Sequence, residues 1–173
     1  LVDVPLFSNI VLAGGAIDLA GNEEQKRRFL PELISGAKFI SFAYQEGARH
    51  TPNLITTKLR EESEGYTLNG KKQLVLDGGS ANKLIVVCRS SGARTDREGL
   101  SIVAVDAKAK GVVVKNNLLL DGSRAANIEF QDVLVSKEDL IGALGQGADT
   151  LDQLYAQASV ALSSEMLGSA QTA

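Results

Sequence analysis

The chain has 173 residues, of which 44% are hydrophobic, and carries a net charge of -3 at pH 7. Acidic and basic residues are interspersed, so we expect neither a nucleic acid nor an anionic membrane as a partner. One cysteine and one histidine form neither a disulfide framework nor a metal cluster, and no apolar run approaches the ~20 residues that cross a bilayer. A cytoplasmic protein is therefore the default expectation. Because the chain opens inside an apolar run at Leu1, we interpret it as part of a longer protein.

Residues 7–36 have the apolar spacing of two helices. Gly21 ends the first helix. Asn22 is the predicted N-cap of the second helix, and Gln25 occupies the position of a capping box. Pro31 lacks a backbone N–H, so we expect it to kink this helix or to open a short new one that Gly36 ends.

From Lys38 onward the apolar residues alternate, which indicates strands. The predicted strands are residues 39–44, 55–60, 65–69, 71–76, 84–89, 100–106, 112–119 and 128–135. Asn69–Gly70 predicts a type I′ hairpin turn. Short strands between turn residues favour a mainly β fold, an antiparallel β-barrel or a packed sandwich. The polar loop 90–99 is expected to be exposed and mobile.

Helical spacing returns at residues 148–170, after a glycine-punctuated segment. Gly145 and Gly147 could belong to a dinucleotide fingerprint, but a third glycine and a preceding βα unit are missing, so we interpret the segment as a linker. The cut ends should leave the apolar helical faces of Ala13, Ile17, Leu154 and Leu162 open, so we expect copies of the chain to associate.

Few residues indicate chemistry by themselves. Cys88 lies in an apolar run and is interpreted as a buried side chain. His50 is either a loop residue without a catalytic role or a ligand contact. Glu46 is either a structural hydrogen-bond acceptor or a general base.

Several motifs are similar to those of acyl-CoA dehydrogenases. Residues 21–36, GNEEQKRRFLPELISG, resemble the family segment G-S/T-E-E-Q-K-x-x-x-L-P-x-L-x-x-G. Further motifs follow in the family's order: GYTLNGKK at residues 65–72, DGGSAN at 77–82, FQDVLV at 130–135 and Ile141–Gly142. The ordered set covers nearly the whole chain.

The resemblance implies a central antiparallel β-barrel at residues 38–142. Residues 1–37 would end an N-terminal helical domain, and residues 143–173 would begin a C-terminal one. It also implies FAD as cofactor, an acyl-CoA thioester as substrate and an electron-transfer flavoprotein as partner, in a homo- or hetero-oligomer. In the family a carboxylate removes the α-proton while a hydride passes from Cβ to FAD. That base is expected beyond residue 173, so no catalytic residue is assigned within the chain.

The family's flavin wall comes from two strands. The resemblance assigns the first strand to Phe42, Tyr44 and Gln45, where the family pattern is A/V-x-T-E-P-x-x-G-S-D, and the second to Leu74, Val75 and Leu76, where it is W-x-T. The usual tryptophan and threonine are absent here.

Arg49 and His50 replace the glycine and serine that border flavin and thioester, and the resemblance makes them substrate-binding residues. Arg49 would bind a carboxylate or polar acyl group, or else it pairs with Glu46 and fixes the loop. Their pattern looks like the branch that contains small subunits of pimeloyl-CoA dehydrogenase. Two hypotheses follow: an FAD-dependent dehydrogenase of an unusual acyl chain, or a non-catalytic structural subunit.

Overall fold

The computed structural model describes residues 5–47, 49, 51 and 54–172. In these residues three helical elements precede the sheet: η1 (Phe7–Gly14), which has π-type hydrogen bonding, α1 (Gly15–Ala20) and α2 (Glu23–Ile34). The strands are β1 (Ile40–Ala43), β2 (Lys58–Glu62), β3 (Gly65–Leu76), β4 (Lys83–Arg89), β5 (Leu100–Asp106), β6 (Val112–Leu118), β7 (Arg124–Val135) and β8 (Leu140–Ile141). The 3₁₀ turn η2 (Lys137–Asp139) precedes β8, and α3 (Ala148–Thr172) follows it.

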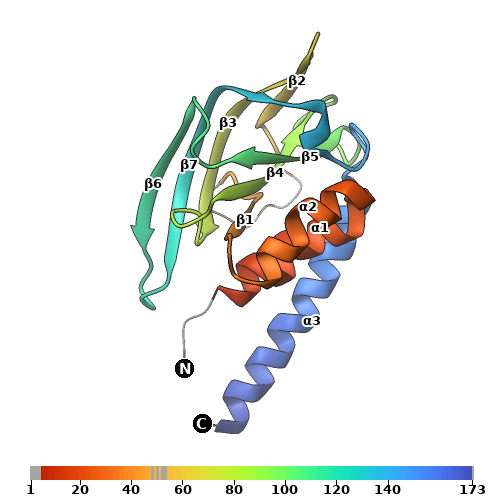
Figure 1. The fold of residues 1–173 in the computed structure, drawn as a ribbon. Coiled ribbons are helices and arrows are strands. Elements are labelled where there is room, and N and C mark those ends of the chain that lie inside the picture. Colours follow the sequence, from red (N-terminus) through yellow and green to blue (C-terminus); the bar gives the residue numbers. More distant parts are fainter. Residues whose placement is uncertain (1–4, 48, 50, 52–53, 173) are drawn as a thin grey trace.

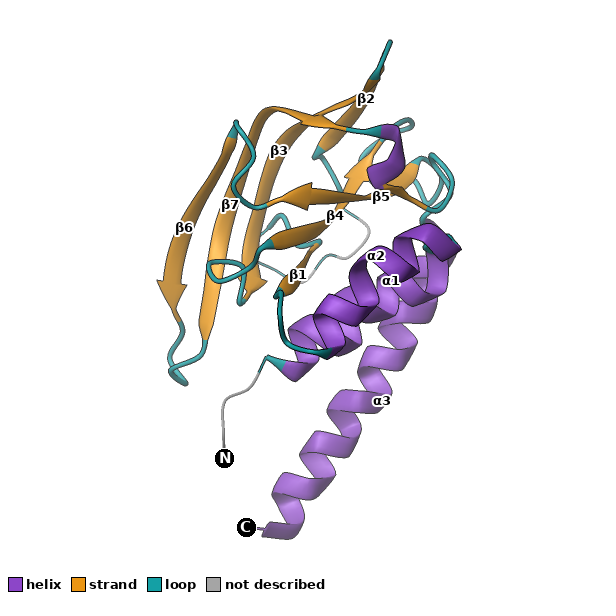
Figure 2. Cartoon of the chain, in the orientation of Figure 1, coloured by secondary structure: helices purple, strands orange, loops and turns teal. Residues whose placement is uncertain are grey.

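The strands form one sheet that folds over on itself, and the helices pack against the side made by β1, β4 and β5 (Figures 1 and 2). Sheet order is β6-β7-β3-β2-β4-β5-β8, and β1 pairs with β4. In Figure 1, β4 and β5 run across β3 and β7. One apolar core lies between these two groups of strands, and a second lies between β1, β4, β5 and the helices. Alternate residues of β4 enter the two cores, which explains its unbroken apolar run.

The predicted closed antiparallel barrel is wrong in two respects. Seven of the eight strands form an open path whose ends are β6 and β8, and β1 joins the sheet beside β4, off this path. In addition, β1 pairs with β4 in parallel, with Ile40 opposite Lys83, and Lys58 of β2 has a parallel partner in Arg89. Parallel pairing joins segments that are distant in the chain, so alternation within each strand could not reveal it. The mainly β character with flanking helices is confirmed.

The predicted hairpin turn at Asn69–Gly70 is also wrong. β3 continues through both residues, and its register with β7 shifts between Leu68 and Gly70, as in a β-bulge. Asn69 exchanges hydrogen bonds with Asp132, donating through Nδ2 and accepting the Asp132 N–H, both at 2.9 Å. Gly70 has φ +151°, and an added Cβ would lie 2.5 Å from Thr57 Oγ1. The glycine therefore permits close approach of another segment, while the β2–β3 hairpin turns after Glu62.

The helical predictions are partly confirmed. Asn22 and Gln25 form the expected capping box. However, α2 contains Pro31 and continues to Ile34, so the alternative of a separate helix at Pro31 is wrong. Pro31 lies three residues before the end of α2, and the helix continues although proline supplies no N–H to it.

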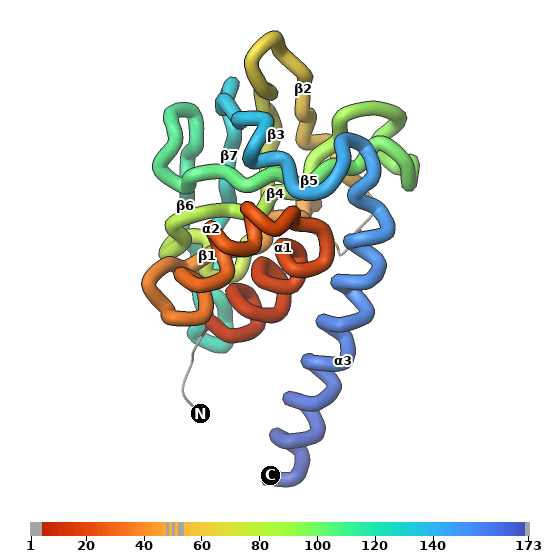
Figure 3. The backbone as a smooth tube through the Cα atoms, turned by 45° about the vertical axis from the view of Figure 1, so that its right-hand side comes forward, coloured from red at the N-terminus to blue at the C-terminus, as the bar shows by residue number. Residues whose placement is uncertain are grey.

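The predicted open helical faces are mostly closed. Ala13, Ile17 and Leu154 are buried where α3 packs against η1 and α1. Only Leu162 of the four is exposed, on the C-terminal half of α3, which extends away from the other elements (Figure 3). The predicted strand at residues 55–60 begins later, at Lys58.

Candidate functional site

An apolar cleft of ≈ 430 Å³ lies where the ends of β1 and β3 meet η1 and α3. Its lining includes all six residues that the sequence assigned to the cofactor: Phe42, Tyr44, Gln45, Leu74, Val75 and Leu76. These residues come from two segments about 30 positions apart, which the sheet brings together. Arg49 is exposed and does not line this cleft. His50 lies outside the described residues.

A bulge shapes the β3 wall of the cleft. The register of β3 against β7 shifts between Lys72 and Val75, and Leu74 adopts a left-handed φ of +51°. Gln73 donates its backbone N–H to the Gln45 carbonyl at 2.8 Å, and Leu74 donates its own to Asn127 Oδ1 at 3.2 Å. A left-handed leucine is strained by on the order of 1–3 kcal/mol, and such strain persists where surrounding contacts fix the backbone. The bulge leaves Leu74 half exposed at the cleft.

Aromatic rings form the opposite part of the lining. The centroids of Phe42 and Tyr44 lie 5.7 Å apart, and Tyr44 packs edge-on against Tyr155 of α3, also at 5.7 Å. Burial raises the pKa of Tyr155, with smaller contributions from Tyr44 and Asp152. The Tyr155 hydroxyl is buried and has no hydrogen-bond partner among the described residues. An apolar cleft with aromatic walls and a buried hydroxyl that has no partner among the described residues fits a flat ring system with a hydrogen-bonding edge.

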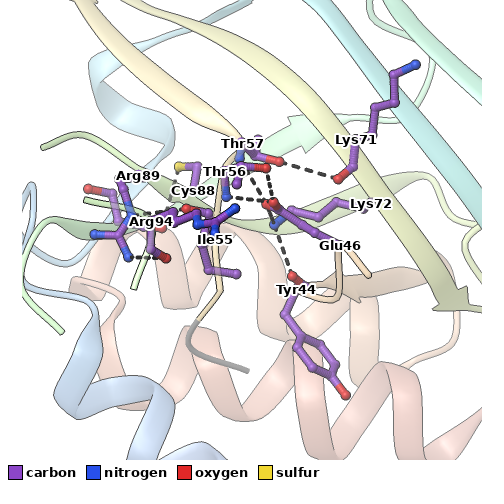
Figure 4. A network of polar contacts seen from close by, with 11 residues as sticks. Tyr44, Glu46, Ile55, Thr56, Thr57, Lys71, Lys72, Cys88, Arg89 and Arg94 are labelled. Carbon is purple, nitrogen blue, oxygen red and sulfur yellow. Dashed lines mark hydrogen bonds and ion pairs between the residues drawn. The ribbon is translucent and has the colours of Figure 1, made fainter. Parts of the chain in front are cut away.

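A buried ion pair fixes the two cleft walls relative to each other (Figure 4). Lys72 Nζ of β3 lies 2.6 Å from Glu46 Oε1 and donates to the Tyr44 carbonyl at 3.0 Å. Both side chains are almost fully buried. Lys72 thereby joins the Tyr44–Glu46 segment to the strand that supplies Leu74 two residues later.

Glu46 also receives hydrogen bonds from Thr56 N at 2.6 Å, Thr57 N at 3.0 Å and the Thr56 hydroxyl. Burial alone would raise the pKa of Glu46, but the Lys72 ammonium and these donors outweigh burial and lower it. A carboxylate held ionised by four donors is a poor general base. The interpretation of Glu46 as a structural acceptor is confirmed, and its partner is Lys72, whereas the sequence had suggested Arg49.

Sequence reasoning missed Lys72 and Tyr155. One signal for Lys72 was present, because residues 66, 68 and 72 share one parity along β3 and point toward the core. Tyr155 had no such signal, since it reaches the cleft only through the packing of α3 on η1. Cys88 is buried and free, as predicted.

Among the described residues, no group of three or more His, Cys, Asp or Glu side chains could hold a metal ion. None of the described helices combines the length and apolar character of a membrane span.

Comparisons with known proteins agree on one family. The model of the acyl-CoA dehydrogenase middle domain matches residues 44–133, more than half of the chain. A 3-(aryl)acrylate reductase of Clostridium sporogenes is 29% identical over 94% of this chain and 44% of its own length. The CarC subunit of the caffeyl-CoA reductase–Etf complex of Acetobacterium woodii is 29% identical over 100% of this chain and 46% of its own.

The fold agrees with that match. Butyryl-CoA dehydrogenase from Megasphaera elsdenii superposes with a TM-score of 0.81 and 26% identity, covering 88% of this chain and 41% of that one. The chain thus spans less than half the length of the relatives it matches.

Proposed function

The chain belongs to the acyl-CoA dehydrogenase family, and we propose that it is the central part of an FAD-dependent enzyme that dehydrogenates an acyl-CoA thioester between Cα and Cβ. In this proposal residues 38–142 are the middle domain. Residues 1–37 end an N-terminal helical domain, and residues 143–173 begin a C-terminal one. The observation that carries the proposal is the cleft lined by Phe42, Tyr44, Gln45, Leu74, Val75 and Leu76.

The cleft residues suit an isoalloxazine ring. Apolar side chains of β3 would cover one part of the ring, and Phe42 and Tyr44 another. The unpartnered Tyr155 hydroxyl is free to donate to a ring carbonyl. When bound, FAD would supply the acceptor for the hydride that leaves Cβ. The chain's own residues would bind the ring, exclude water and hold the two walls in register through Lys72 and Glu46.

The remaining parts of the proposal concern groups outside the cleft. Arg49 and His50 are proposed to contact the acyl-CoA substrate, and the exposed position of Arg49 leaves its guanidinium accessible. The α-proton base is proposed to lie beyond residue 173. An electron-transfer flavoprotein is the proposed electron acceptor, which the name of the CarC relative supports. Assembly as a homo- or hetero-oligomer would cover the exposed C-terminal half of α3.

A non-catalytic structural subunit is the alternative. One observation favours it: the cleft has aliphatic side chains at Leu74 and Leu76, where many family members have an aromatic ring and a hydroxyl. Loss of both would weaken the hold on the flavin and remove a donor near its reactive edge.

Flavin content and turnover separate the two functions. We would purify the full-length protein alone and with the product of a neighbouring gene, record the flavin absorbance and assay acyl-CoA oxidation with an artificial electron acceptor. Bound flavin with turnover supports the enzyme. Folded protein without flavin in both preparations supports the structural subunit.

A matched pair of α3 variants tests the cleft itself. Ala158 lines the cleft, whereas Ala156 is exposed on the same helix. Ala158→Phe should fill the cleft and abolish flavin binding, and Ala156→Phe should leave it unchanged. Flavin retained in folded Ala158→Phe would reject this cleft as the flavin site.

A further inference from the structure

The helical segment η1 has an unusual winding where it meets the cleft. Gly15, the residue that follows it, donates its backbone N–H to the carbonyl of Ile10, five residues earlier, which is the π-type pattern. The segment runs directly into α1 and supplies Phe7 and Leu12 to the cleft lining. π-type winding is rare in proteins and occurs mostly as single turns, frequently at functional sites. We therefore expect contacts outside the segment to maintain it.

Two polar side chains on the inner face of η1 make such contacts. Ser8 is 3% exposed and Asn9 is 6% exposed, whereas the neighbouring Ile10 is 38% exposed. With hydrogen bonds between residues five apart, Ser8 and Ala13 lie on one face of the segment, and both are buried. The winding therefore turns two polar residues inward and an isoleucine outward. Because a buried polar group is costly without a hydrogen bond, both side chains need partners in the fold.

The partner of Ser8 lies at the end of the β3 wall. The Ser8 hydroxyl donates to Asp77 Oδ2 at 2.5 Å. Asp77 directly follows Leu76, the last cleft residue of β3, and has a left-handed φ of +54°. Its backbone N–H donates to the Arg124 carbonyl of β7 at 2.9 Å, which fixes the position of the acceptor. Because a carboxylate forms a short and strong hydrogen bond, this contact joins η1 firmly to the β3 wall.

Asn9 makes the corresponding contact with the β1 wall. Its Oδ1 accepts the backbone N–H of Ile40, the first residue of β1, at 2.8 Å, and this hydrogen bond is buried. Phe42 follows two residues later on the same strand and lines the cleft. The third wall is α3, whose Ala158 belongs to the same apolar core as Leu12 of η1. The segment η1 thus contacts all three walls of the cleft.

We propose that Ser8 and Asn9 are positioning residues of the cleft. By holding η1 in its π-type winding, they fix Phe7 and Leu12 against the ligand and keep the β1 and β3 walls at the spacing that admits a flat ring. Neither Ser8 nor Asn9 lines the cleft, so each acts through its neighbours, and Phe7 is the neighbour of Ser8 that reaches the ligand. The inference rests on the proposed function, because FAD is the ligand that tests it.

Flavin binding by the full-length protein tests the positioning role. Ser8→Ala and Asn9→Ala should each weaken FAD affinity about five- to tenfold, the effect of one lost hydrogen bond, and shift the visible absorption band of the flavin that stays bound. Asp77→Asn, which keeps an acceptor and tolerates the left-handed φ, should retain the affinity. In a Phe7→Ala background, Ser8→Ala should have less than about a twofold further effect, because the residue through which it acts is gone.

Asn82→Ala is the matched control. Asn82 Oδ1 accepts the Phe39 backbone N–H at 2.9 Å, one residue before the N–H that Asn9 accepts, and Asn82 lies outside η1. Its loss should change FAD affinity by less than about twofold. A loss in Asn82→Ala as large as that in Asn9→Ala would overturn the proposal, because anchoring of β1 would then suffice. Unchanged affinity in folded Ser8→Ala and Asn9→Ala would overturn it as well.

Amide hydrogen exchange gives a second readout, which does not depend on flavin. In Ser8→Ala and Asn9→Ala, the amides of residues 7–15, 40–45 and 73–77 should exchange about tenfold faster, whereas in Asn82→Ala residues 7–15 should be unaffected. Faster exchange of η1 and both walls in a protein that binds no flavin would reject the proposed function and retain the positioning role. Unchanged exchange beside normal flavin binding would retain the proposed function and reject the positioning role.

Discussion

Lys71 and Lys72 are adjacent on β3 and have opposite surroundings. Lys71 projects to solvent and pairs with Glu129 at 3.0 Å, with 69% of its side chain exposed, whereas the Lys72 side chain is fully buried against Glu46. Alternation along a strand produces this difference between neighbours. Only Lys72 contacts the Tyr44–Glu46 segment of the cleft wall. Comparing substitutions of the two lysines therefore distinguishes the effect of a buried ion pair from that of an exposed one.

Removing the Lys72 ammonium should therefore be costly. Lys72→Met leaves the Glu46 carboxylate buried without its cation and should destabilise the fold by about 3–5 kcal/mol. Lys71→Met, its matched control, breaks only an exposed pair and should change stability little. Urea unfolding followed by circular dichroism measures both. Equal effects of the two substitutions would show that burial of the pair does not stabilise the fold.

The same pair predicts a dependence on pH. The pKa of Glu46 in the fold is lowered below its ordinary value of 4.5. The folded state then binds fewer protons than the unfolded chain near that pH, so the contribution of Glu46 is present above the ordinary value and is lost as pH falls through the lowered one. Glu46→Gln should reduce stability most at neutral pH, and the difference from the unmodified protein should shrink below about 4.5. A difference that stays constant down to acid unfolding would contradict this assignment.

Two shifts of register against β7 distinguish β3 from a regular strand. At the first, beside Gly70, the extra residue lies in β7, where Asp132 has a φ of +48°, and at the second it lies in β3, where Leu74 has a φ of +51°. The residue inserted in β3 at the second shift changes which side chains face the core, so that Lys72 and Val75 are both buried although they are three positions apart. The shape of the cleft wall therefore depends on the register of the whole of β3 and not only on residues 74–76.

Gly70→Ala tests the close approach of Thr57 to β3. Its Cβ would meet the Thr57 backbone and side chain at 2.5–2.7 Å, and a φ of +151° is unfavourable for alanine. We expect a destabilisation of about 2 kcal/mol or more, measured by thermal unfolding. Gly168→Ala is the control, since a Cβ there meets nothing within 4 Å in α3 and should stabilise the helix by up to ~1 kcal/mol. A neutral Gly70→Ala would show that the backbone at Gly70 relaxes freely.

At the scale of the whole molecule, we expect the isolated 173-residue chain to bind flavin only weakly, because its cleft is open. The cleft of ≈ 430 Å³ is open to solvent along α3, whose C-terminal half has no covering element among the described residues. A flavin ring that contacts the protein on so few sides gains too little binding free energy to offset the translational and rotational entropy that it loses. Absorbance of the purified chain after incubation with FAD and gel filtration should show little bound flavin. A stoichiometric flavin spectrum would contradict the prediction.

Local signals in the sequence were sufficient for several elements. The capping box at Asn22 and Gln25 depends on residues three positions apart, and the apolar run of β4 reflects a strand that is covered on both faces. The six cleft residues were identified by motif resemblance, and the fold brings them around one cavity. That they hold a flavin stays a prediction.

The sequence by itself determined the helical and strand periodicities, the buried Cys88 and the family motifs, because each depends on neighbours along the chain or on recognisable patterns. Only the tertiary structure decided the rest. Gly70 permits the close approach of Thr57, where the sequence indicated a turn. Lys72 is paired with Glu46, 26 positions away. Such contacts depend on which segments pack together, and alternation or local propensity does not encode that choice.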